Sequence, residues 1–278
     1  VVNLASFVCI FAFATSGVFA MAAQSQELVM TLENGLPLRL RPPKAGAKGF
    51  HIFLSHNWQH GQSAMRIVKT RLREMLPEVE VFLDVDNLGG GSDHPHIDVS
   101  NTMLCFCTQR WFTNDPCLRE FIRAILRKTP MIALLDPFTG DVHGGHTEAE
   151  AREIIASPEW WERWVKFEER GEVAKWAKEW DQPDLKLPTA QEATDALFAS
   201  APIIWSRLAD FQDVTMREIG ERFIETVSSK GKSGRLTKSK SSAELLDDGL
   251  AHPYGKPADT ELCVKLSMLE IYNETLID

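Results

Sequence analysis

Three places in the chain carry side chains whose types could support chemistry. Ser55-His-Asn-Trp58 follows an apolar run, Asp84 ends a second apolar run, and Glu120 lies near the start of an amphipathic stretch. The indole of Trp58 could stack on a flat ring. A carboxylate such as Glu120 can stabilise the positive charge that develops on a sugar as a glycosidic bond breaks. Each residue also has a structural alternative, because Trp58 could cover the sheet edge and Glu120 could favour a helix start through the macrodipole.

The histidine pairs are weaker candidates. His94 and His96 are separated by one proline, and His143 and His146 by two glycines. Imidazole pairs can bind transition metals, but neither pair has a third ligand at a fixed spacing. We therefore expect loop histidines and no metal site.

The stretch that begins at Asp84 could bind a phosphate but not a calcium ion. Gly89-Gly-Gly91 could present backbone amides to a phosphate. Asp84 and Asp86 do not form an EF-hand, because Leu88 occupies the fifth position and no glutamate closes the loop. We expect Asp84 to shape a pocket by capping nearby amides instead of acting as an acid or base.

The elements that must position these residues alternate in type. Short apolar segments that are nearly free of charge predict strands covered on both faces. Between them, apolar residues recur at helical spacing. The alternation predicts an α/β fold with a five-stranded parallel sheet, flavodoxin-like order, helices on both faces and ligands at the carboxyl ends of the strands. The predicted strands are 50–55, 79–84, 101–107, 131–135 and 202–205.

A Trp-rich stretch at about 147–200 separates the last two predicted strands and is long for a simple crossover. It opens with Thr147-Glu-Ala-Glu150, a capping-box pattern. Trp160, Trp161 and Trp164 would form one aromatic face on a helix. We expect this face to pack on the sheet, and the alternative is a partner-binding surface.

Composition narrows the class of protein. The 278 residues are 44% apolar and carry a net charge of −9, with a pI near 5.4. That balance argues against non-specific nucleic-acid binding, which needs a basic face. The five cysteines are scattered, which predicts a reduced, intracellular protein without a disulfide framework.

The N-terminal residues have two open interpretations. Residues 4–23 carry no charge and are long enough to cross a bilayer, and the basic residues that follow would place the rest of the chain in the cytoplasm. A cleaved secretory signal is disfavoured because no basic region precedes the apolar run. Alternatively, Met21 resembles an ordinary start and residues 1–20 are upstream sequence. Either interpretation leaves 1–23 and a linker at 24–48 outside the core.

Beyond the predicted domain lie two further segments. Residues 228–256 have the composition of a flexible basic linker. Residues 257–278 resemble a fragment of the kinesin motor domain. The chain contains no Gly-x-x-x-x-Gly-Lys-Ser/Thr phosphate loop, so ATP-driven motor activity is excluded.

Three motifs in order resemble the Toll/interleukin-1 receptor (TIR) domain. The stretch Phe50-His-Ile-Phe-Leu-Ser-His-Asn-Trp58 is similar to its first strand. Val81-Phe-Leu-Asp-Val-Asp-Asn-Leu-Gly-Gly-Gly91 is similar to its second strand and BB loop, and Cys117-Leu-Arg-Glu-Phe-Ile-Arg-Ala124 to the helix that carries the glutamate of NAD-cleaving members. The resemblance covers residues 49–227, about two thirds of the chain.

This resemblance implies a site. It makes Glu120 the catalytic residue of an NAD⁺ hydrolase or cyclase, with NAD⁺ as substrate and neither a metal nor another cofactor. Several catalytic members carry Tyr or Arg where this chain has His56, so a positive charge for the pyrophosphate is missing. The residues expected to bind the nucleotide are Phe53, Ser55, His56, Trp58, Asp84 and Leu88.

Two functions remain open at this stage. One is NAD⁺ cleavage, which in this family usually needs two TIR domains. The other is a non-catalytic adaptor whose head-to-tail contacts can propagate. Both predict a cytoplasmic domain, anchored to a membrane only if residues 4–23 are a genuine span, that associates with other TIR domains in signal transduction of the innate-immunity kind. We take NAD⁺ cleavage as the working hypothesis.

Overall fold

The structure, a computed structural model, describes residues 29–31, 38–84, 94–136 and 144–228. The chain divides into two compact units, residues 1–237 and 238–278, and every described residue belongs to the first. The predicted apolar segment, the kinesin-like segment and nearly all of the basic linker lie outside the described residues. Within the described part of the chain, no helix is long and apolar enough to cross a membrane.

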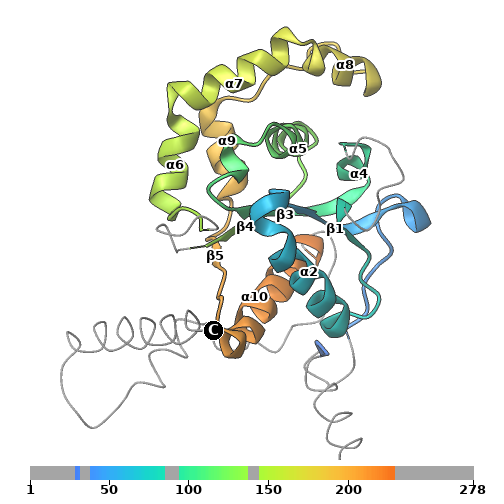
Figure 1. The fold of residues 1–278 in the computed structure, drawn as a ribbon. Coiled ribbons are helices and arrows are strands. Elements are labelled where there is room, and N and C mark those ends of the chain that lie inside the picture. The colour runs from blue at the N-terminus through green and yellow to red at the C-terminus, as the bar shows by residue number, and fades with distance from the viewer. Residues whose placement is uncertain (1–28, 32–37, 85–93, 137–143, 229–278) are drawn as a thin grey trace, which may run out of the picture. The chain divides into compact units, whose positions relative to one another are not determined.

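One sheet of five parallel strands organises the first unit, in the order β2-β1-β3-β4-β5 (Figure 1). This order confirms the predicted flavodoxin-like α/β fold. The edge strands β2 and β5 are shorter than predicted, because each pairs with a single neighbour over two residues. The strands are β1 Phe50–Ser55, β2 Val81–Phe82, β3 Ser100–Cys107, β4 Met131–Leu135 and β5 Ile203–Ile204.

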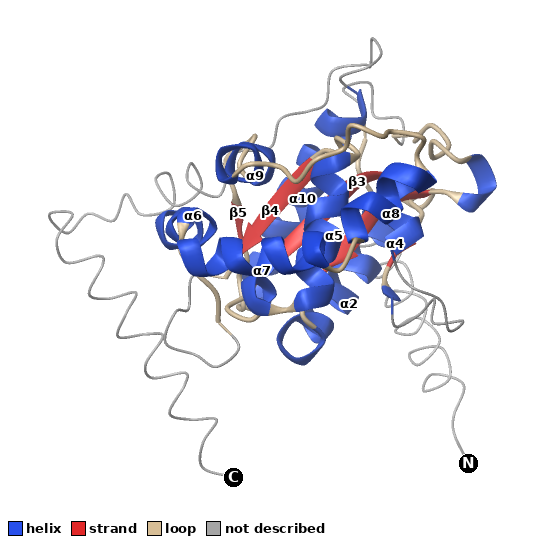
Figure 2. Cartoon of the chain, turned by 90° about the horizontal axis from the view of Figure 1, so that it is seen from above, coloured by secondary structure: helices blue, strands red, loops and turns tan. Residues whose placement is uncertain are grey.

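Helices cover both faces of this sheet, which is why all but one residue is buried in each of β1 and β3 (Figure 2). On one face, Ile52 and Leu54 pack against α2 and α10. On the other, Phe53 shares a core with α4, α5 and α9. The helices are α2 Trp58–Met75, α4 His94–Asp98, α5 Asp115–Leu126, α9 Ala190–Leu197 and α10 Ala209–Ser228.

The Trp-rich insertion forms α6 Glu148–Ala156, α7 Pro158–Glu169 and α8 Glu172–Glu179 before α9. Its predicted capping box is present, with Thr147 and Glu150 bonded reciprocally. Trp160 and Trp164 are buried as expected, but their partner differs from the prediction. They contact Phe121 of α5, because α5 already covers that face of the sheet. Helices α7 and α8 lie on the side of α5 away from the sheet (Figure 1).

Candidate functional site

The carboxyl edge of the sheet gathers polar residues from several strands. Ser55 is the last residue of β1, and Asp84 follows β2. The register pairs Phe53 with Phe82. Asp84 therefore comes level with Ser55, two residues farther along each strand. This is the edge at which ligands bind in open α/β sheets.

A buried hydrogen-bonded chain links this edge to α5. The Ser55 hydroxyl donates to Glu120 Oε2 at 2.6 Å, and Ser55 Oγ accepts from Trp111 Nε1 at 3.0 Å. Glu120 is only 6% exposed. Asn114 is the N-cap of α5, and its side chain accepts a hydrogen bond from the Cys117 N–H at 3.2 Å. The sheet and α5 thus bring together a serine and a glutamate that the resemblance assigns to the same site.

A second pair lies at the same edge. Trp58 Nε1 donates to Asp84 Oδ2. Asp84 is buried, whereas 51% of Trp58 is exposed. Trp58 opens α2, where the Asn57 side chain accepts the Gln59 N–H at 3.1 Å. The bond to Asp84 holds one edge of the indole while much of the side chain is accessible, an arrangement that suits ring stacking.

His56 lies between Ser55 and Trp58 in the sequence, and its side chain is buried. Its Nδ1 lies 3.2 Å from the Leu54 carbonyl. Burial lowers the pKa of His56, and the charge of Asp84 opposes that shift. The ring is therefore neutral at pH 7 and supplies no positive charge at this edge of the sheet.

Two of the predicted nucleotide-binding residues, Phe53 and Leu88, are not seen among the polar residues at this edge. Phe53 is fully buried and stacks on Phe82, with ring centroids 4.8 Å apart, in the core that also holds α5. It supports the strand ends from within, and its contact with a nucleotide stays a prediction. Leu88 lies outside the described residues.

The thiols beside Glu120 are not nucleophiles. Burial raises the pKa of Cys117 well above its ordinary value, and the charge of Glu120 raises it further. Burial likewise raises the pKa of Cys105. Both thiols are therefore protonated at neutral pH and react slowly while they are buried. Among the described residues there is no cluster of three side chains that could hold a metal ion.

Sequence reasoning missed two features of this edge. Trp111 bonds to Ser55, and its only signal was a Trp-Phe pair directly after the third predicted strand. Arg207 follows β5 and makes bonds of 3.0 and 2.7 Å to Asp136 after β4. Neither partner could be identified from spacing, because 71 residues separate Arg207 from Asp136.

Comparison with known proteins finds similar solved structures but no matching family. No family model and no curated protein matches the sequence. One similar solved structure is that of the TIR domains in the activated Roq1 resistosome directly recognizing the pathogen effector XopQ. The two are 12% identical with a TM-score of 0.41, over 63% of this chain and 99% of that one. A similarity of this degree does not assign the chain to a family.

Proposed function

We propose that this chain signals through TIR-type self-association and cleaves NAD⁺, with Glu120 at the reactive centre. The observation that carries this proposal is the buried Ser55–Glu120 hydrogen bond at the carboxyl end of β1. It joins the first and third of the three motifs that resemble the TIR domain, at the sheet edge where ligands of this fold bind. The proposal rests on that local geometry together with the sequence motifs.

The reaction would convert NAD⁺ and water to nicotinamide, ADP-ribose and a proton. As the N-glycosidic bond breaks, its electron pair leaves with nicotinamide and positive charge develops on the ribose. The Glu120 carboxylate would stabilise that charge, as carboxylates do in glycoside hydrolysis. Burial lowers the local dielectric and strengthens such an interaction. The role of Ser55 would be to hold one oxygen of the carboxylate, which orients the group.

The surrounding residues would bind the rest of the dinucleotide. Trp58 would stack on the nicotinamide or adenine ring while Asp84 fixes its orientation. Arg110 lies beside the first turn of α2, with Nη1 3.5 Å from Gln59 Oε1. This exposed guanidinium would supply the pyrophosphate with the cation that His56 does not provide.

A non-catalytic adaptor is the second candidate. The observation in its favour is that Glu120 is buried and bonded to Ser55. A satisfied internal carboxylate can simply tie α5 to β1. In that case TIR-type contacts alone would carry the signal, and their head-to-tail geometry would allow filaments.

The test is NAD⁺ consumption by the full chain concentrated on a crowding surface, with self-association measured on the same samples. The variants are Glu120→Gln and a control, Glu153→Gln, which changes an exposed glutamate of α6. Loss of activity in Glu120→Gln alone supports the enzyme. If all three proteins self-associate and none consumes NAD⁺, the adaptor is the function. An active Glu120→Gln variant would remove Glu120 from the mechanism.

A further inference from the structure

The Trp-rich insertion contacts α5, and the residues just before it, at several points. Its polar side chains contact the segment from just before α5 to its last turns, and the contacts advance in the same direction along both partners. The insertion is therefore attached at several separate points to the side of α5 opposite the sheet (Figure 1). In chain order the contacts are Trp160 to the Phe112 carbonyl, Arg163 to the Thr113 carbonyl, Arg170 to Asp115, Glu172 to Arg119 and Glu179 to Arg123.

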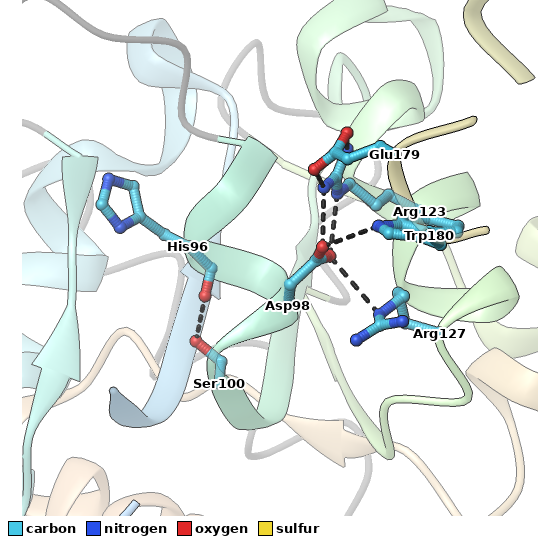
Figure 3. A network of polar contacts seen from close by, with 7 residues as sticks. All are labelled: His96, Asp98, Ser100, Arg123, Arg127, Glu179 and Trp180. Carbon is cyan, nitrogen blue, oxygen red and sulfur yellow. Dashed lines mark hydrogen bonds and ion pairs between the residues drawn. The ribbon is translucent and has the colours of Figure 1, made fainter. Parts of the chain in front are cut away.

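Arg123 makes the strongest of these attachments. Its guanidinium is 2% exposed and binds Asp98 of α4 through two bonds, of 2.8 and 2.7 Å. It also binds Glu179 of α8 through bonds of 2.7 and 3.3 Å. One planar group thus joins three helices, and bidentate pairs of this kind fix geometry as well as adding energy (Figure 3).

The neighbours of Arg123 complete the network. Trp180, the residue after α8, donates Nε1–H to Asp98 Oδ2 at 2.9 Å. Arg123 lies 4.8 Å from the centre of the Trp180 ring, and Arg127 lies 5.0 Å from it. Arg127 also approaches Asp98, at 3.7 Å. Asp98 is therefore the point where α5 and the end of α8 meet α4 (Figure 3).

Arg123 comes one helical turn after Glu120 on the same helix. Any shift of α5 that breaks the Arg123 bonds would also change the 2.6 Å contact between Ser55 and Glu120. Displacements of about 1 Å in a reactive group can reduce a rate by about 100-fold. The position of Glu120 thus depends on what holds the outer side of α5.

We propose that the insertion is a clamp that positions Glu120, with Arg123 and Glu179 as its main positioning residues. Its effect on catalysis rests on the proposed NAD⁺ cleavage, whereas its effect on α5 does not. The insertion is then part of the working site although none of its residues reaches the carboxyl ends of β1 and β2. A purely structural cover would contribute to unfolding stability without controlling Glu120.

The test uses Glu179→Gln and Arg123→Lys in the full chain. Glu179 is 44% exposed on its side chain, so its variant is expected to fold. The control is Glu148→Gln, which removes a 2.6 Å pair with Arg152 inside α6 and leaves the Arg123 network intact. Each protein is examined at the same interval below its own melting temperature, which removes differences in global stability.

The first readout is alkylation of Cys117 by iodoacetamide, followed by peptide mass spectrometry. Cys117 is 2% exposed and lies one turn before Glu120 in α5. We expect both clamp variants to label about tenfold faster than wild type or more, because charge-assisted bonds to a buried group are lost. The control should label at the wild-type rate. Unchanged labelling in the clamp variants would overturn the clamp.

The second readout is the kinetics of NAD⁺ cleavage. We expect kcat to fall about tenfold or more in the clamp variants while KM changes by less than about twofold, because the substrate-binding side chains are untouched. Faster Cys117 labelling with unchanged kcat would overturn the positioning role. If wild type does not cleave NAD⁺, the proposed enzyme fails, and the labelling result still decides whether the insertion clamps α5.

Discussion

Two buried tryptophans of α7 differ in one hydrogen bond. Trp160 Nε1 donates to the Phe112 carbonyl at 2.9 Å. Trp164 is also buried, with its ring 4.5 Å from that of Trp160, but its Nε1 has no hydrogen-bond partner among the described residues. Replacing either with Phe removes the same atoms from the same cluster. The cavity contribution to the change in stability is therefore about equal in the two variants.

The hydrogen-bond contributions have opposite signs. Trp160→Phe leaves the buried Phe112 carbonyl without this donor, which costs about 1–3 kcal/mol beyond the cavity. Trp164→Phe removes an N–H whose unpaired burial already costs roughly 1–3 kcal/mol, and that gain offsets the cavity. We expect Trp160→Phe to be less stable than Trp164→Phe by about 2 kcal/mol or more. For a domain of this size the difference corresponds to roughly 4–8 °C in Tm.

The assay is thermal and urea unfolding of both variants and wild type, followed by far-ultraviolet circular dichroism, because the substitutions alter tryptophan fluorescence. The two urea slopes should agree, which would show that the variants expose the same surface on unfolding. Equal destabilisation of the two variants would refute the reasoning. A larger loss of stability in Trp164→Phe than in Trp160→Phe would refute the reasoning more strongly.

Two further predictions concern charges elsewhere in the fold. Bonds from the backbone N–H and hydroxyl of Thr147 lower the pKa of Glu150 from 4.5, and Thr189 does the same for Glu192. The stabilisation that comes from a lowered carboxyl pKa is present above about pH 4.5 and is lost as the pH falls through the folded-state pKa. Glutamine does not titrate, so the Tm of the Glu150→Gln/Glu192→Gln double variant should fall less than that of wild type between about pH 5 and pH 3. An equal loss would contradict this assignment. Asp136→Asn should lower the free energy of unfolding by about 1–3 kcal/mol, since buried Asp136 accepts two bonds from Arg207; an unchanged urea midpoint would argue against that role.

The central strands were predictable because both of their faces are covered. Segments 50–55 and 131–135 match β1 and β4 in full, since a charge-free apolar run of that length suits a buried parallel strand. The predicted strand at 79–84 pairs with its neighbour over only two residues at the sheet edge. Hydrophobicity marks which residues are buried, but the extent of an edge strand depends on its single neighbour.

In the insertion and the site, too, the sequence indicated which residues are buried but not which residues they contact. Helical spacing predicted that Trp160 and Trp164 are buried, but a periodicity does not name the surface that covers them. Arg123 occurs in an amphipathic stretch, and its partners lie 25 and 56 residues away, so nothing local signals its network. Ser55 and Glu120, which are 65 residues apart, were assigned to one site only through the TIR resemblance, and their hydrogen bond was not predicted.

The most direct test of the central claim is the amount of nicotinamide released per NAD⁺ lost by the crowded full chain. For wild type, the account predicts that the nicotinamide released equals the NAD⁺ lost. For Glu120→Gln, it predicts no nicotinamide release above background. In Ser55→Ala, which leaves the Glu120 carboxylate without the hydroxyl that orients it, the release rate should fall about tenfold or more. Nicotinamide release by Glu120→Gln at the wild-type rate would contradict the account.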